Sequence, residues 1–64
     1  MPPEWTGEVI GIMHNNRVSF QRVANAVGWN VKYLSAVMNG KRQPAGAEVA
    51  VRDALARILE GREQ

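Results

Sequence analysis

The chain has 64 residues, a hydrophobic content of 45% and a formal net charge of +2. A chain of this length forms a single small core, so we expect residues 1–64 to be one domain. Because it contains no cysteine and only one histidine, it has neither a disulfide framework nor the usual ligands of a zinc site. No signal-peptide pattern and no apolar run of membrane-spanning length is present, which predicts a cytoplasmic protein without membrane contact.

The charges are unevenly distributed along the sequence. Five cations and no acid lie between residues 9 and 47, whereas all six acids lie outside that interval. These cations are Arg17, Arg22, Lys32, Lys41 and Arg42. A chain this short can show such a pattern by chance on a solvated surface. The pattern also predicts a cationic surface that faces a polyanion such as DNA or RNA.

The first predicted element is a helix at about residues 4–15. Its apolar residues, from Trp5 to Met13, recur at the spacing of one helical face. Gly7 and Gly11 each weaken a helix by about 1 kcal/mol relative to alanine. We therefore expect a packing reason for these glycines, such as the close approach of another helix.

Two shorter helices follow, separated by a tight turn. Ser19 is the expected N-cap of a helix that Gly28 ends, and Asn30 is the expected N-cap of a helix that the Asn-Gly pair at 39–40 ends. The second of these helices has an apolar inner face and an outer face of short polar side chains with one cation. Two helices joined at a glycine in this way, here over about residues 19–38, are typical of a helix-turn-helix.

A last helix is predicted at about residues 47–60, with a glycine at its end. Its apolar residues are Val51, Leu55, Ile58 and Leu59. No stretch shows the alternation of a strand. The expected fold is therefore all-α, a compact bundle of four or five short helices that contains the helix-turn-helix.

Residues 9–44 resemble the DNA-binding domain of the phage lambda-type repressor and Cro family, also known as the XRE family. That family has an apolar position, Thr or Ser, Leu-Ala, an apolar residue with Gly, a second helix, and Asn-Gly followed by basic residues. The matching positions are Val18, Ser19, Val23-Ala24, Val27-Gly28, Val31 to Met38 and Asn39-Gly40-Lys41-Arg42. The resemblance implies a small transcriptional regulator that binds double-stranded DNA and reads the major groove with helix 30–38.

The resemblance also implies which side chains meet the DNA. The base contacts would be Asn30, Val31, Lys32, Ser35 and Ala36. The contacts to the DNA backbone would be Ser19, Gln21, Arg22, Tyr33, Asn39, Lys41 and Arg42. Base contacts specify sequence, whereas backbone contacts set the position of the protein on the duplex.

A homodimer on a two-fold operator, formed in solution or only on DNA, is a further expectation, in the cytoplasm of a bacterial or phage-infected cell. Its interface would use either the apolar residues of the last helix or an uncharged second face of the first. The second face would consist of Ile10 with Gly7 and Gly11. No cofactor, metal or small-molecule ligand is indicated.

Three departures from the family pattern concern apolar residues. Phe20 stands where the family often has a glutamine that contacts phosphate, so that contact is lost or passes to neighbouring polar residues. Trp29 replaces a smaller aliphatic residue and is expected at the boundary of the core. Met13 and Met38 occupy the two positions of a family ion pair, and we expect them to pack against each other.

The sequence also bears on two other classes of function. A protein-interaction module, such as an antirepressor or an antitoxin-like partner, could use the same helix-turn-helix scaffold, and a recognition helix with a single cation fits that alternative. An enzyme is not expected, because the sequence has one histidine, no cysteine, no phosphate-binding glycine loop and no paired acids.

Overall fold

The computed structural model describes residues 2–61, and within that range it contains four α-helices and no strand. They are α1 (Glu4–Asn15), α2 (Phe20–Val27), α3 (Val31–Met38) and α4 (Ala47–Leu59). The all-α fold is thereby confirmed, with four helices where four or five were expected. No helix in this range is both long and apolar enough to cross a membrane.

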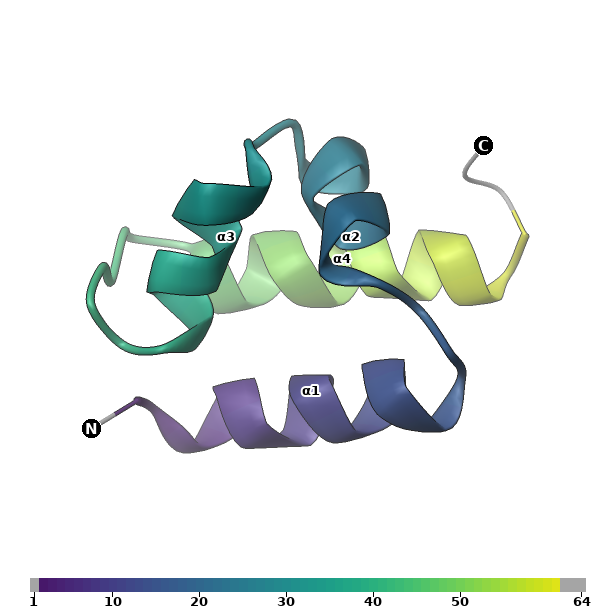
Figure 1. Ribbon diagram of the computed structural model, residues 1–64, viewed down its shortest axis with the longest axis horizontal. Helices are drawn as coiled ribbons and strands as arrows, with labels where there is room; N and C mark the ends of the chain where they lie inside the picture. The colour runs from purple at the N-terminus through teal and green to yellow at the C-terminus, as the bar shows by residue number, and fades with distance from the viewer. Residues whose placement is uncertain (1, 62–64) are drawn as a thin grey trace.

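The helices form two layers (Figure 1). α1 and α4 run in the same direction along the long axis of the molecule, and α2 and α3 lie in front of α4 in this view. α2 has the most extensive contacts, because it packs against both α4 and α3, while α1 packs against α4. The start of α1 and the end of α4 lie at opposite ends of the molecule, which measures 31 × 22 × 18 Å.

The core draws side chains from all four helices and from the α1–α2 turn. Its buried cluster consists of Val9, Met13, Val18, Val23, Ala24, Leu34, Met38, Val51, Leu55 and Ile58. Met13 and Met38 are only 3% and 2% exposed and belong to this one cluster. Two thioethers can be buried there without the desolvation cost of an ion pair. Direct contact between the two side chains remains a prediction.

α4 buries more of its apolar residues than its sequence indicated. Val51, Leu55 and Ile58 are at most 4% exposed, and of the four residues predicted as its apolar face only Leu59, at 46%, faces solvent. The interpretation that these four residues offer a dimer interface is therefore wrong for the first three. The physical reason is that α4 is covered by α1 on one side and by α2 on another, so its core-facing stripe is unusually wide.

The glycines of α1 do not mark a helix contact. Both Gly7 and Gly11 are exposed, and a Cβ atom added to either would have no neighbour within 4 Å outside its own helix. α1 reaches the core through Val9 and Met13, and positions two residues away from these lie on the far side of the helix. The expected close approach of another helix is thus wrong within the described residues.

The α1–α2 turn holds a residue in an unusual conformation. Arg17 has a φ of +56°, which is in the left-handed region. The N–H of Val18 donates to the carbonyl of Met13 at 2.8 Å, and that of Arg17 donates to the carbonyl of His14 at 3.2 Å. These two hydrogen bonds end α1 in the pattern that usually forms around a left-handed glycine. For a residue with a side chain, that conformation costs roughly 1–2 kcal/mol.

Candidate nucleic-acid interface

A three-residue turn, residues 28–30, joins α2 to α3. Gly28 has a φ of +93°, a conformation that glycine adopts without a steric penalty. The N–H groups of Gly28 and Trp29 both donate to the carbonyl of Ala24 at 2.9 Å. The turn therefore fixes the direction in which α3 leaves α2, and the two helices pack against each other as the helix-turn-helix prediction requires.

The N-termini of both helices are capped by the predicted side chains. The Oγ of Ser19 accepts a hydrogen bond from the N–H of Arg22 at 3.1 Å, and the Oδ1 of Asn30 accepts one from the N–H of Tyr33 at 2.8 Å. Such caps stabilise a helix by about 1 kcal/mol each. Because its Oδ1 accepts this bond, the Nδ2 of Asn30 is the donor that the side chain would offer to a base. Neither helix has an acid in its first turn, so the positive end of each helix dipole is not offset there.

The C-terminus of α3 fixes the start of the following loop. Gly40 has a φ of +80°. The N–H groups of Lys41 and Arg42 both donate to the carbonyl of Ala36, at 2.9 and 3.3 Å. The bond from Lys41, together with that from the N–H of Gly40 to the carbonyl of Val37 at 3.1 Å, is the hydrogen-bond pattern of a Schellman motif, in which a left-handed glycine reverses the chain. The backbone from which the two cations extend is thus held in a defined position beside α3.

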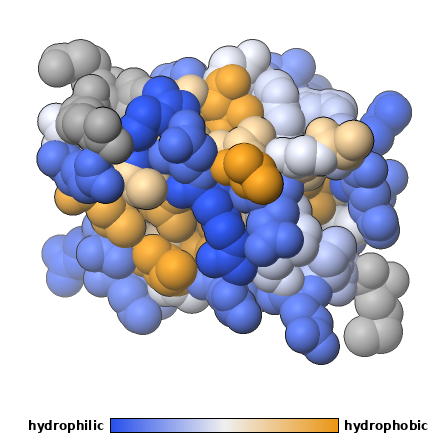
Figure 2. Space-filling view, turned by 180° about the vertical axis from the view of Figure 1, so that it is seen from behind, coloured by the Kyte–Doolittle hydropathy of each residue, from blue (hydrophilic) through white to orange (hydrophobic). Residues whose placement is uncertain are grey.

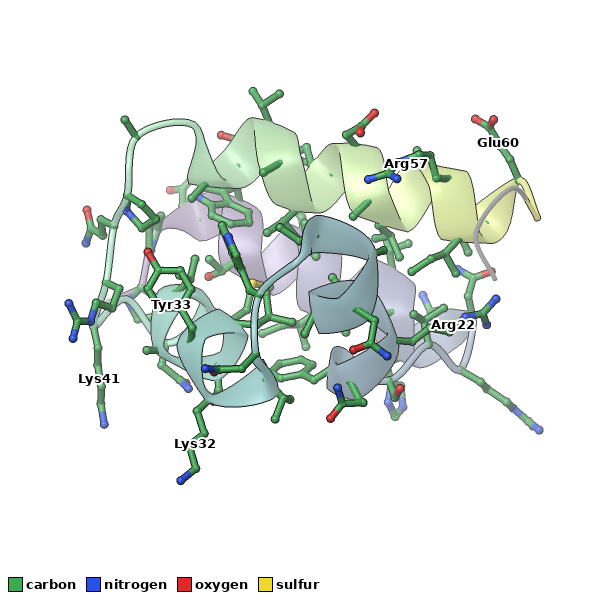
Figure 3. All side chains as sticks on the ribbon, turned by 90° about the horizontal axis from the view of Figure 1, so that it is seen from above. Arg22, Lys32, Tyr33, Lys41, Arg57 and Glu60 are labelled. Atoms are coloured by element: carbon green, nitrogen blue, oxygen red, sulfur yellow. The ribbon has the colours of Figure 1, made fainter. Side chains whose placement is uncertain are left out.

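The outer face of α3 carries one long cation among short side chains. Lys32 is exposed and points away from the helix (Figure 3). Val31, Ser35 and Ala36 are half-buried. A helix surface with side chains this short can approach base edges closely, which reading the major groove requires.

Asn39 stabilises the end of this face. Its Nδ2 donates to the carbonyl of Ser35 at 2.8 Å and lies 3.3 Å from the Oγ of the same residue. The side chain predicted to touch the DNA backbone is therefore engaged with α3, and its Oδ1 is an acceptor only. A contact from Asn39 to phosphate would have to use an Nδ2 hydrogen that is not engaged in these bonds.

Three aromatic residues of α2, α3 and the turn between them pack against the core or against each other. Trp29 and Phe20 are half-buried and pack against the core cluster, so the expectation of a boundary tryptophan is confirmed. The rings of Trp29 and Tyr33 meet edge to face, with centroids 4.9 Å apart and an interplanar angle of 86°. Phe20 has no donor for phosphate, so it cannot replace the glutamine that the family often has there.

The remaining predicted backbone contacts lie on α2 and at the start of the α3–α4 loop. Figure 3 shows that Lys41 and Arg22 extend toward opposite ends of the molecule, with Lys32 between them. Gln21 is exposed at the start of α2, where its Nε2 donates to the Oδ1 of Asn25 at 2.9 Å. The structure thus places Lys32 and Lys41 at the α3 end of the molecule and Arg22 on α2 toward the other end, and it does not gather the cations at a single point.

The cations of this surface differ from those of α4 in their partners. Within residues 2–61, the side chains of Arg17, Arg22, Lys32, Lys41 and Arg42 form no hydrogen bond or ion pair. All five are exposed. Their charge is therefore not neutralised by the described part of the chain and is available to a partner.

The cations of α4, in contrast, are engaged. Arg52 lies 2.8 Å from the Oε1 of Glu8 and 2.9 Å from the Oε2 of Glu48. The hydrogen bond with Glu8, followed by that with Glu48, raises the pKa of Arg52. The Nε of Arg57 lies 3.2 Å from the Oδ2 of Asp53, and its Nη2 donates to the carbonyl of Ala26 at 3.3 Å.

Two hollows lie outside the outer face of α3. One, of about 390 Å³, is formed by the segment that precedes α1, the α3–α4 loop and the start of α4; it is lined by Pro3, Trp5, Val37, Arg42, Gln43, Pro44, Gly46, Ala47, Glu48 and Val49. The sequence did not indicate this hollow, whose volume is in the range of small-molecule pockets. The other, of about 140 Å³, lies between α1 and α4, and its lining includes Ile12 and Leu59.

Exposed apolar side chains are found on α1 and α4. They are Ile10, Ile12, Val49 and Leu59. Figure 2, which shows the molecule from behind, reveals hydrophobic areas separated by a hydrophilic band. No group of three or more potential metal ligands occurs in the part of the chain that the structure describes.

Comparisons with protein-family models, with curated proteins and with solved structures found no match. The likeness to the repressor and Cro family therefore rests on the sequence positions given above.

Proposed function

We propose that the chain binds double-stranded DNA sequence-specifically, as a small repressor-like or Cro-like transcriptional regulator that inserts α3 into the major groove. One observation supports this proposal above the others. The exposed cations of the acid-free segment form no hydrogen bond or ion pair within residues 2–61, and two of them, Lys32 and Lys41, lie on and beside a short-side-chain face on the second helix of a helix-turn-helix.

The proposal assigns different roles to two sets of residues. Lys32 donates to a guanine, and the neighbouring base contacts come from Asn30, Val31, Ser35 and Ala36. Phosphate contacts hold the domain on the duplex; they come from Ser19, Gln21, Arg22, Tyr33, Asn39, Lys41 and Arg42. The rigid start of the α3–α4 loop supports the assignment of its two cations, because their backbone is fixed relative to α3.

A titration of fluorescent random-sequence duplex DNA at several salt concentrations tests the proposal. We expect the logarithm of the affinity to fall linearly with the logarithm of the salt concentration, by about 0.9 for each phosphate contact. Duplex RNA of the same sequence is the matched control, because its deep and narrow major groove does not admit a helix. Selection from a random duplex library then identifies the operator. Equal binding of the two duplexes, with no enriched motif, would contradict sequence-specific reading.

We further propose that two copies bind a two-fold operator, because one short recognition helix contacts few bases. The exposed apolar residues Ile10, Ile12, Val49 and Leu59 are the available surface. Sedimentation with an inverted-repeat operator, compared with a single half-site, measures the stoichiometry. One protomer bound to an operator that lacks any inverted repeat would exclude the dimer.

A protein-interaction module is the second candidate function. The exposed apolar side chains of α1 and α4 favour it, since apolar areas rimmed by polar residues are common at protein interfaces. The titration with random duplex DNA separates the two functions. A module that binds only protein shows no salt-dependent affinity for DNA.

A further inference from the structure

Arg17 combines three properties that the folding of the domain does not require together. Its backbone is left-handed, with a φ of +56°, and no other non-glycine residue within residues 2–61 has a positive φ. Its side chain is exposed. Its guanidinium forms no hydrogen bond or ion pair in the described part of the chain. Arg17 is not among the DNA contacts that the family resemblance implies.

The conformation at this position favours glycine or asparagine over arginine. The four glycines with positive φ, Gly28, Gly40, Gly46 and Gly61, occupy the ends of the other helices or the start of α4. At the end of α1, arginine takes the same conformation at a steric cost. Nothing within residues 2–61 offsets that cost through the side chain. Within the described residues, the contacts of the side chain therefore give no structural reason for an arginine at this position.

The position of Arg17 connects it with the proposed DNA surface. It lies two residues before Ser19, which caps α2, in the connection that runs from the end of α1, at the end of the molecule away from α3, to the start of α2 (Figure 1). The bond from the Val18 N–H to the Met13 carbonyl, at 2.8 Å, holds this turn against α1. The nearest charged residue along the chain is Arg22, also a cation, and the first turn of α2 has no acid.

We propose that Arg17 is a further DNA-backbone contact, whose guanidinium binds a phosphate at the edge of the groove entered by α3. This inference rests on the proposed DNA binding. The left-handed backbone directs the side chain from a rigid turn instead of from a helix, so the phosphate contact is partly organised before binding. Arginine suits such a contact because its planar donors bind phosphate oxygens in pairs.

Substitution by residues that tolerate the left-handed conformation gives a sharp test. Arg17→Asn removes the charge and relieves the strain, so the melting temperature should stay the same or rise. The slope of log affinity against log salt should become shallower by about 0.9, and the affinity at about 0.1 M salt should fall roughly eightfold. Arg17→Lys keeps the charge and should retain most of that slope.

Arg52→Gln is the matched control, because it also removes one positive charge but lies in the ion pairs of α4, away from the proposed surface. It should leave the DNA affinity and the salt slope unchanged. If Arg17→Asn binds DNA with the affinity and slope of the unaltered chain, the inference is wrong and the proposed function stands. If Arg17→Asn and Arg52→Gln weaken binding equally, only net charge matters, and the inference is again wrong. If the unaltered chain binds no DNA, both proposals fail.

Discussion

The two charged regions of this molecule use their cations in opposite ways. On the side of α1 and α4, Arg52 lies between Glu8 and Glu48, and Arg57 is engaged with Asp53. On the side of α2, α3 and their flanking turns, the described cations have no such partner. Ion pairs within a chain neutralise a surface, whereas an acid-free surface keeps its potential for an external anion. The net charge of +2 therefore does not reveal that one surface is neutralised by ion pairs while the other keeps its positive charge.

The largest expected effect comes from the core that joins the two regions. Met13→Ala or Met38→Ala should each lower the free energy of unfolding by roughly 2–5 kcal/mol, because a cavity remains in a packed site. If the two side chains touch, the double variant loses less than the sum of the single losses. Urea denaturation of the four proteins measures this. Strictly additive losses would show that the methionines do not pack against each other.

The second effect concerns the unpaired region alone. Lys41→Ala with Arg42→Ala should make the slope of log affinity against log salt shallower by about 1.8, and at about 0.1 M salt it should weaken DNA binding roughly 60-fold. Both side chains are exposed and carry no described contact, so the stability should change little. Binding titrations and thermal melts together make the measurement. An unchanged slope would remove these two cations from the interface.

Only part of this difference between the two charged regions could be predicted from the sequence. The helix ends were predictable because capping is local: Ser19 and Asn30 bond the backbone three residues ahead, and the glycines at 28 and 40 take the left-handed conformation. The acid-free segment could also be read directly. The pairing of Arg52 with Glu8 joins residues distant in the chain, so it became visible only once α1 and α4 were placed side by side.

Other features depended on packing through space. The sequence could not show that α4 is covered by both α1 and α2. Three core residues of α4 were therefore interpreted as part of a possible dimer interface. Nor could it show that the glycines of α1 face away from α4. The left-handed conformation of Arg17 was not predicted, because a left-handed helix end is usually formed by glycine or asparagine and neither is present at that position.

A third prediction separates specific from general binding within the unpaired region. Lys32→Ala should reduce the preference at one base pair of a selected operator by about 1–3 kcal/mol and leave the affinity for random DNA nearly intact. The reason is that Lys32 extends from the outer face of α3, between the flanking cations (Figure 3). Competition between operator variants measures the preference. Equal loss of affinity for the operator and for random DNA would instead make Lys32 a phosphate contact.

The smallest effect should come from breaking the paired region. Arg52→Gln removes the ion pairs with both Glu8 and Glu48, of which the first joins α1 to α4. Exposed ion pairs contribute little to stability, and salt screens them, so we expect a small fall in melting temperature that shrinks further as salt is added. Because the substitution leaves two carboxylates without their cation, the surface of α1 and α4 becomes more acidic while the α2–α3 surface is unchanged. Thermal melts at low and high salt measure the first effect, and a DNA titration measures the second. If the two regions are independent, the salt slope of DNA binding stays that of the unaltered chain; a shallower slope would show that the cations of α4 also contact DNA and that the division between the regions does not hold.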